Sequence, residues 1–148
     1  MKRPLLMMFG LSVAASSSMM ACTSDSKISA TGFCTVATAY AQRGTEMSQA
    51  VDSADPVLVK TAVTTVGDQL RKLVESAPDA IATELTLLNS TYKQFVTVVA
   101  GADYDLAVLS GTPEAEAILA KLDSNEVNAA NSKVEQYISD TCGVTVTS

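Results

Sequence analysis

The sequence predicts an all-α fold, an antiparallel bundle of four main helices. Apolar residues recur at helical spacing through most of the chain after residue 31, and no good strand pattern interrupts them. The connections between the predicted helices are short, which favours antiparallel neighbours. Hydrophobic residues make up 47% of the 148 residues and charged residues 18%, a balance that is not typical of a disordered chain. Because only 5% are aromatic, small aliphatic side chains must form most of the core.

The first helix is predicted over residues 32–43, with the sequence GFCTVATAYAQR. Gly44 follows as a natural helix stop. A helical pattern resumes over residues 45–53, where Met47 and Val51 are four apart. The apolar stripe of the first helix consists of Phe33, Val36, Ala37, Tyr40 and Ala41.

The second and third helices have clear start signals. Asp55 offers a carboxylate as N-cap, and Pro56 takes the first helical position, where no amide donor is needed. Pro78 breaks the chain, after which a third helix opens with Asp79 in its first turn and ends at Ala100-Gly101. Its heptad-like seam consists of Ile81, Leu85, Leu88, Tyr92, Phe95 and Val99.

The last part of the chain predicts a short helix and then a long one. Thr112-Pro113 starts the short helix. Asp123 and Glu126 fit a capping box at the start of the long helix, which reaches Cys142 and stops at Gly143. The tail after it alternates as a strand would, but no partner strand is available, so we expect an irregular end.

Residues 1–21 have the pattern of an export signal. Lys2 and Arg3 form a short positive region, and Leu5 to Ala15 form an apolar run. That run is shorter than the roughly 20 apolar residues that a membrane-spanning helix needs. Five of the six methionines lie in this segment, so its composition differs from the rest of the chain. We therefore expect a signal peptide that is removed on export.

The four residues Met19-Met20-Ala21-Cys22 resemble the lipobox of bacterial lipoproteins, with methionine where leucine is more usual. The resemblance implies attachment of diacylglycerol to the Cys22 sulfur and cleavage before Cys22. It also implies a domain held at the cell membrane or envelope, on the extracytoplasmic side. The alternative is an ordinary thiol at Cys22 in a leader that is cleaved differently or not at all. Residues 22–31 read as a flexible tether, and residues 32–148 as the helical domain.

The three cysteines of the chain leave one unpaired if the protein is exported. If Cys22 carries lipid, Cys34 and Cys142 remain as a pair in an oxidising compartment. In an up-down-up-down bundle the start of the first helix lies beside the end of the last, so we expect one disulfide to close the bundle. The alternative is two buried free thiols.

Six residues at the two ends of the predicted domain resemble those of small lipid-anchored or secreted helical proteins of bacteria, of actinobacterial type. They are Phe33, Cys34, Tyr137, Ile138, Cys142 and Gly143. The function of that group is largely unknown, so the resemblance implies a fold and a location and no activity.

The composition disfavours several classes of function. The formal net charge is −6, and −8 once Lys2 and Arg3 are removed, so binding of nucleic acid is not expected. The chain contains no histidine, the commonest metal ligand and general base in proteins. Ser90 and Lys93 could form a dyad, but such pairs are common on solvated helix faces.

The acidic residues after the predicted third helix match a calcium-binding loop only in part. Asp103, Asp105 and Glu114 fall at loop positions one, three and twelve of an EF-hand. Val108 stands where that loop needs glycine, and it looks like a core residue. We therefore predict neither a metal site nor a cofactor, and no catalytic residue.

The function expected from the sequence is a non-catalytic binding module at the membrane surface, whose partner is an unknown envelope protein or ligand. The alternative is a carrier or sensor of a small apolar ligand within the bundle. Four aromatic residues at helical spacing could line such a cavity, although residues of this kind more often form plain core: Tyr40, Tyr92, Phe95 and Tyr137.

Overall fold

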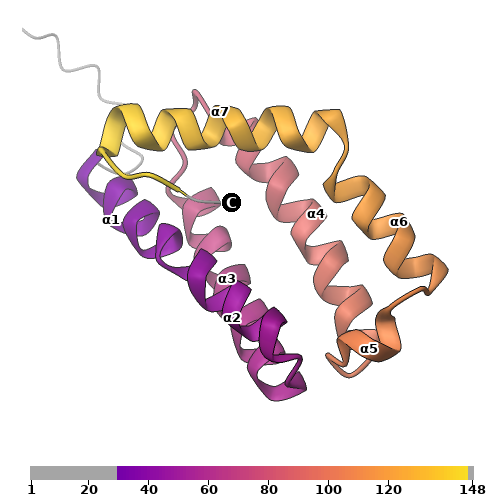
Figure 1. Cartoon of the computed structure of the whole chain (residues 1–148). Helices are drawn as coiled ribbons and strands as arrows, with labels where there is room; N and C mark the ends of the chain where they lie inside the picture. The colour runs from indigo at the N-terminus through magenta and orange to yellow at the C-terminus, as the bar shows by residue number, and fades with distance from the viewer. Residues whose placement is uncertain (1–29, 147–148) are drawn as a thin grey trace, which may run out of the picture.

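The computed structural model describes residues 30–146, which form α-helices joined by short loops, without a strand in that range (Figure 1). The predicted all-α class is therefore confirmed. The helices are α1 (Ala30–Ala41), α2 (Arg43–Ser53), α3 (Pro56–Glu75), α4 (Ala82–Gly101), α5 (Leu106–Leu109), α6 (Pro113–Leu122) and α7 (Asn125–Cys142).

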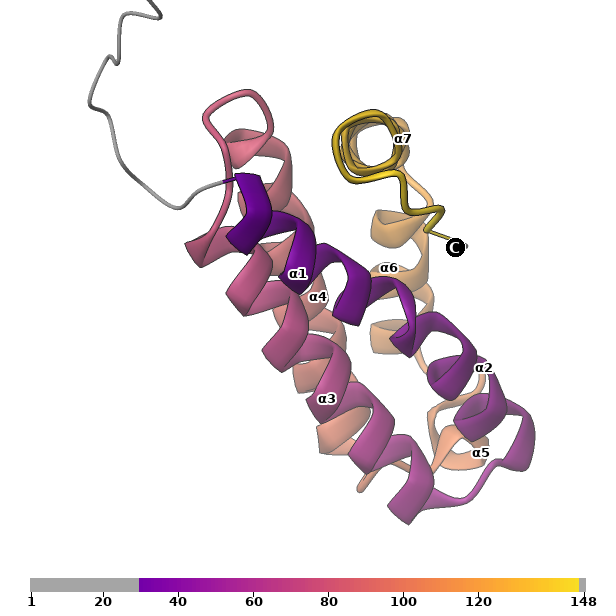
Figure 2. The same cartoon turned by 90° about the vertical axis from the view of Figure 1, so that its left-hand side faces the viewer.

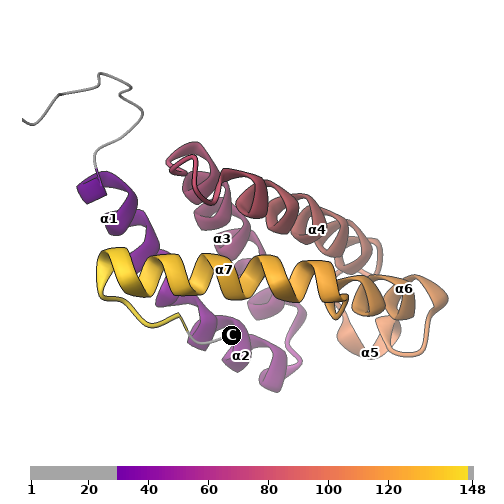
Figure 3. The same cartoon turned by 90° about the horizontal axis from the view of Figure 1, so that it is seen from above.

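The predicted antiparallel four-helix bundle is not confirmed. Helices α1 and α2 form one bent arm that packs along α3, and α3 packs against α4 (Figures 1 and 2). The chain then returns beside α4 through the short helices α5 and α6. Because α6 already packs against α4, the last helix runs across the molecule from the end of α6 to the start of α1 (Figure 3).

Side-chain caps mark the starts of four helices of the described chain, α3, α5, α6 and α7. Asp55 Oδ1 accepts hydrogen bonds from the backbone N–H groups of Val57, at 2.8 Å, and Leu58, at 3.3 Å, as predicted. Thr112 caps α6 through a bond from the Ala115 N–H at 3.2 Å. Gly143 ends α7 with φ 65°, a left-handed conformation that glycine adopts without strain.

Four predicted boundaries need correction. Helix α1 begins at Ala30, inside the predicted tether of residues 22–31. The arm bends at Gln42 and α2 continues through Gly44, so the glycine is not a stop. Helix α4 begins at Ala82, three residues after Asp79. The cap of α7 is Ser124, whose Oγ accepts from the Val127 N–H, because the preceding Asp123 still ends α6.

Two apolar clusters hold the helices together. The first lies where α7 crosses the other helices, and its buried members are Phe33, Ala37, Leu70, Leu73, Ile81, Leu85, Val134 and Ile138. The second joins α2, α3 and α4 toward the other end, and its buried members are Ala50, Val59, Ala62, Val63 and Val99. Tyr92 packs against both clusters, so it lies at their junction.

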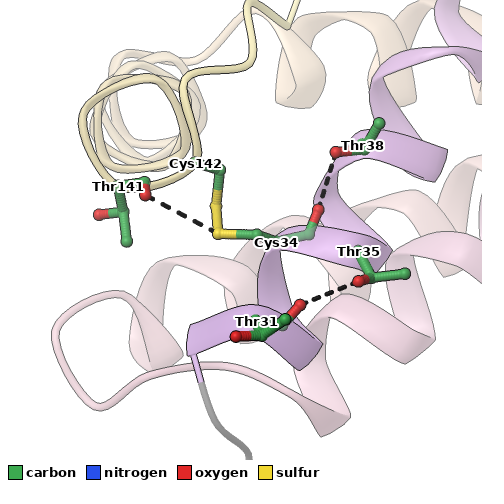
Figure 4. The surroundings of a disulfide bond; sticks show 6 residues. All are labelled: Thr31, Cys34, Thr35, Thr38, Thr141 and Cys142. Atoms are coloured by element: carbon green, nitrogen blue, oxygen red, sulfur yellow. Dashed lines mark hydrogen bonds between the residues drawn. A yellow bond between two sulfur atoms is a disulfide. The ribbon is translucent and has the colours of Figure 1, made fainter.

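A disulfide joins Cys34 to Cys142, with a Cα–Cα distance of 5.2 Å and a sequence separation of 108 (Figure 4). The predicted pairing is confirmed, although the helix that brings Cys142 to α1 lies across the fold. The Thr141 carbonyl oxygen lies 3.9 Å from Cys34 Sγ, a contact rather than a hydrogen bond because a bridged sulfur carries no proton. In the first turns of α1, Thr35 and Thr38 donate to the carbonyl oxygens of Thr31 and Cys34, both at 2.9 Å.

The predicted signal peptide, residues 1–21, and the predicted lipid attachment point, Cys22, lie outside the described residues. Among the residues that the structure does describe, no helix has the length and apolar character needed to cross a membrane.

Candidate functional site: a cleft at the bend of the arm

A cleft of about 480 Å³ opens at the bend between α1 and α2. The bend at Gln42 supplies one side of it, and α3, α4, α7 and the C-terminal tail supply the other. We call this space the outer lobe. Its lining residues are Tyr40, Ala41, Arg43, Gly44, Thr45, Met47, Ser48, Val66, Tyr92, Asn131, Glu135 and Val146.

A second, smaller space of about 220 Å³ adjoins the outer lobe, and we call it the inner lobe. Tyr40, Tyr92 and Asn131 line both lobes, so the two are neighbours, and we call them together the central cleft. The remaining lining residues of the inner lobe are Leu70, Leu88, Thr91, Leu122, Val127 and Asn128.

Thr91 places a polar atom in this apolar setting. The residue is 1% exposed and lines the inner lobe, and its Oγ1 has no hydrogen-bond partner among the described residues. Most threonines on these helices donate to the carbonyl four residues earlier, as Thr97 does to Lys93 at 2.9 Å. A buried hydroxyl without a partner costs about 1–3 kcal/mol. A hydrogen-bonding group without a partner in the described structure therefore lies in the wall of the inner lobe.

The two tyrosines of the cleft are held in their neutral form. Tyr92 donates its hydroxyl to the Val63 carbonyl at 2.9 Å. Burial raises the pKa of Tyr92 well above its ordinary value, and the charge of Tyr40 in its ionised form adds to this. Burial also raises the pKa of Tyr40, with a further contribution from the carboxylate of Glu135.

The charged groups of the outer lobe differ in how they are paired. Arg43 forms a salt bridge with Glu46, three residues later on α2. The Nε atom of the same arginine is buried and has no partner in the described part of the chain. Glu135 accepts a hydrogen bond from the Asn131 side-chain amide at 2.8 Å. Its partner is thus neutral, and its charge is left available.

The C-terminal tail closes one edge of the cleft. The left-handed Gly143 turns the chain back after α7, and Val144 and Val146 pack against the first apolar cluster. Val146 is also a lining residue of the outer lobe. The described part of the tail is irregular, as predicted. Its alternating valines, Val144 and Val146, pack onto the helices and pair with no strand of the described chain.

Two of the four aromatic residues predicted to line a cavity do so in the central cleft. Tyr40 and Tyr92 line both of its lobes. Phe95 lies with its ring centroid 5.7 Å from that of Tyr92 but lines a different groove. Tyr137 packs edge-on against Phe33, with ring centroids 5.9 Å apart, and does not line either lobe.

The sequence interpretation missed the polar lining of the cleft: Arg43, Thr91, Asn131 and Glu135. A signal was present for two of them, because Asn131 and Glu135 are four apart and therefore share a face of α7. That face differs from the buried stripe of the same helix, which consists of Val127, Ala130, Val134 and Ile138.

Two side chains considered as metal ligand or catalytic group, Asp105 and Ser90, form local hydrogen bonds in the described structure. Asp105 Oδ1 caps α5 by accepting from the N–H groups of Ala107 and Val108, at 2.9 and 3.3 Å. Val108, predicted to be core, is 62% exposed. Ser90 donates to the Leu87 carbonyl of its own helix at 2.8 Å. Within residues 30–146 no group of histidine, cysteine, aspartate and glutamate side chains could hold a metal ion.

A separate apolar groove of about 420 Å³ lies between the end of α2, α5 and α6. It is on the part of the molecule farthest from the start of α1 (Figures 1 and 2). Val51 and Leu119 line it and are 46% and 58% exposed. Val57, Leu58 and Val108 are exposed on neighbouring elements.

Comparison with known proteins yields no match to a family model, to a curated protein or to a solved structure.

Proposed function

We propose that this chain is an exported lipoprotein, anchored at Cys22, whose helical domain binds a small ligand with a largely apolar body. The binding is non-catalytic, so the role is that of a carrier or a sensor at the membrane surface. The proposal joins the two functions expected from the sequence, because it keeps the anchored binding module and takes the small ligand as its partner.

The central cleft is the observation that carries the proposal. Protein interiors are packed with few voids larger than a water molecule. Here the bend of the arm leaves a space of about 480 Å³ between the end of α1, the first part of α2 and the facing residues of α3, α4 and α7. Small-molecule sites typically measure about 300–1,000 Å³ and combine apolar walls with a few polar groups. The cleft has this composition, with Ala41, Met47, Val66 and Val146 as apolar walls.

The proposal is tested by native mass spectrometry of the intact chain extracted from membranes in mild detergent. We expect a bound molecule at a stoichiometry of one per chain, released on unfolding. Ala41→Leu adds a larger side chain to the wall of the outer lobe and should abolish co-purification.

The matched control is Ala129→Leu, the same change at an exposed site on α7 that lines neither lobe. It should leave the bound molecule in place. A wild-type chain that carries no ligand, and that binds none from a lipid or metabolite extract, would contradict the proposal. Circular dichroism and thermal unfolding establish that both variants fold.

A second candidate function is docking of another envelope protein. The observation that favours it is the apolar groove between α2, α5 and α6, with Val51 and Leu119 exposed along it. Exposed apolar patches of this kind mark interaction surfaces. Cross-linking in intact cells through a cysteine placed at Val108 would favour this function if it captured one envelope protein and no ligand were found in the cleft.

A further inference from the structure

Glu135 is the charged residue of the cleft whose charge is not compensated. It lies on α7, is half-buried and lines the outer lobe. Across residues 30–146, no lysine or arginine nitrogen lies within 4.0 Å of its carboxylate, and its hydrogen bond comes from the neutral amide of Asn131. The other charged group of the lobe, Arg43, is already paired with Glu46. The lobe therefore carries a net negative charge.

Two aromatic rings share the outer lobe with this carboxylate. Tyr40 and Tyr92 both line it, and Tyr40 lies close enough to Glu135 for the carboxylate to raise its pKa. The faces of aromatic rings attract cations, more strongly where water is excluded. A carboxylate beside two neutral tyrosines is a combination that binds ammonium groups.

The apolar walls of the outer lobe and the net charge of the domain are also consistent with a cationic ligand that has an apolar body. Ala41, Met47, Val66 and Val146 offer apolar contacts to a short chain or ring. Residues 30–146 contain seven basic and fifteen acidic side chains, a net charge of −8. A field of this sign raises the local concentration of cations and opposes anions.

We infer that the central cleft selects an organic monocation, an amine with a short apolar body, whose ammonium group pairs with Glu135 beside Tyr40 and Tyr92. The inference rests on the proposed function and names its ligand class. The apolar body lies along the walls of the outer lobe, and the unpartnered Thr91 hydroxyl in the inner lobe can bond to a polar group at the far end of a longer ligand.

The test uses three probes with the same apolar body and different head groups: hexylammonium, hexanol and hexanoate. Each is titrated into the full chain carrying Cys22→Ser, so that an attached lipid does not compete, and binding is measured by calorimetry. We expect hexylammonium to bind about tenfold more tightly than hexanol, and hexanoate to bind weakest. Amide chemical shifts of Gly44 and Asn131 should move on binding, which places the probe in the cleft.

Glu135→Gln is the decisive variant, because glutamine keeps the oxygen that accepts from Asn131 but removes the charge. It should reduce the affinity for hexylammonium to that for hexanol and leave hexanol unchanged. The matched control is Glu126→Gln, an exposed acid on the same helix that lines neither lobe. It should leave all three affinities unchanged.

The outcomes separate the two proposals. Equal binding of the three probes, or unchanged selectivity in Glu135→Gln, would overturn the inference and leave a cleft for apolar ligands in general. Tightest binding of hexanoate would overturn it as well and would assign selectivity to Arg43. Failure of all three probes to bind would also overturn the inference, whereas the proposed function would be overturned only if native mass spectrometry found no bound molecule as well.

Discussion

Tyr40 and Tyr92 determine what the cleft can do at the scale of single residues. Each contributes a ring to both lobes, and the Tyr92 hydroxyl is already used by the Val63 carbonyl. Burial favours the neutral phenol over the charged phenolate, so the pKa of each is raised. Among the described residues that line the outer lobe, Glu135 is the only carboxylic acid.

The raised pKa values predict a specific response to alkali. A phenol whose pKa is higher in the folded than in the unfolded chain stabilises the fold fully below about pH 10, and this stability is lost as the pH rises through the folded pKa. We expect both Tyr40 and Tyr92 to ionise above pH 10 in the folded chain, with the larger upward shift of the pKa at Tyr92.

Tyrosinate absorbance can measure this, with Tyr40→Phe and Tyr92→Phe each removing one late-ionising group. As a control, the same titration is carried out in concentrated urea. There the absorbance that the variant lacks relative to wild type should appear at about pH 10. Ionisation of Tyr92 near pH 10 in the folded protein would show that its ring is not buried as described.

Helix α7 is the element that most distinguishes this fold from a simple bundle. Its buried stripe packs on α1 and α4, Lys133 forms a salt bridge with Glu84 of α4, and Cys142 joins it to Cys34. The salt bridge is exposed on its lysine side and stabilises little. The apolar stripe and the disulfide therefore hold α7 in place, and with it Asn131 and Glu135.

Removal of the disulfide is expected to destabilise the fold strongly. In the chain-entropy account a bridge that closes a loop of this length stabilises by up to about 4–5 kcal/mol, and measured values are often lower. Urea unfolding of Cys34→Ser/Cys142→Ser should show this loss against the oxidised wild type.

Reduced wild-type protein is the matched control and should lose as much as the double variant. A difference below about 1 kcal/mol would mean that packing alone fixes α7 on α1.

Local signals in the sequence predicted the helices better than their arrangement. Asp55 and Thr112 cap the helices that begin directly after them, and Gly143 ends the helix directly before it. These roles depend only on residues nearby in the sequence, so they could be predicted from it. Whether α7 packs alongside the other helices or across them depends on how α6 fills the place beside α4, which no local pattern expresses.

The cleft could be predicted only in part for the same reason. Tyr92 and Phe95 have the same helical periodicity, yet Phe95 lies at a different groove. The spacing of residues shows which face of a helix they share. A cavity depends on whether the faces of two helices pack closely, which spacing does not show. In the sequence Glu135 cannot be distinguished from a solvent-exposed acid. It lines a cleft only because the arm bends at Gln42.

The molecule as a whole has two distinct ends. The start of α1, which continues toward the predicted anchor at Cys22, lies beside α7, and the exposed apolar groove lies at the opposite end (Figure 1). A domain held by its N-terminus can therefore present that groove away from the bilayer while the cleft opens from its middle.

The predicted anchor is tested by fractionation of cells. Cys22→Ser should move the protein from the membrane to the soluble fraction, because a stable anchor needs the acyl chains that Cys22 is predicted to carry. Cys34→Ser, which leaves Cys22 intact, should stay with the membrane and is the control. A Cys22→Ser chain that remained membrane-bound would show that the N-terminal segment was misinterpreted.

The wide separation of the bridged cysteines has a consequence for biogenesis if the chain is exported as predicted. If the chain is exported N-terminus first, Cys34 emerges 108 residues ahead of Cys142, its partner in the native disulfide. Cys22 lies only twelve residues ahead and would be the nearer partner until Cys142 emerges. If lipid is attached to the Cys22 sulfur early, this competing short-range bridge cannot form. The same modification that gives the protein its location would then also direct Cys34 to its native partner.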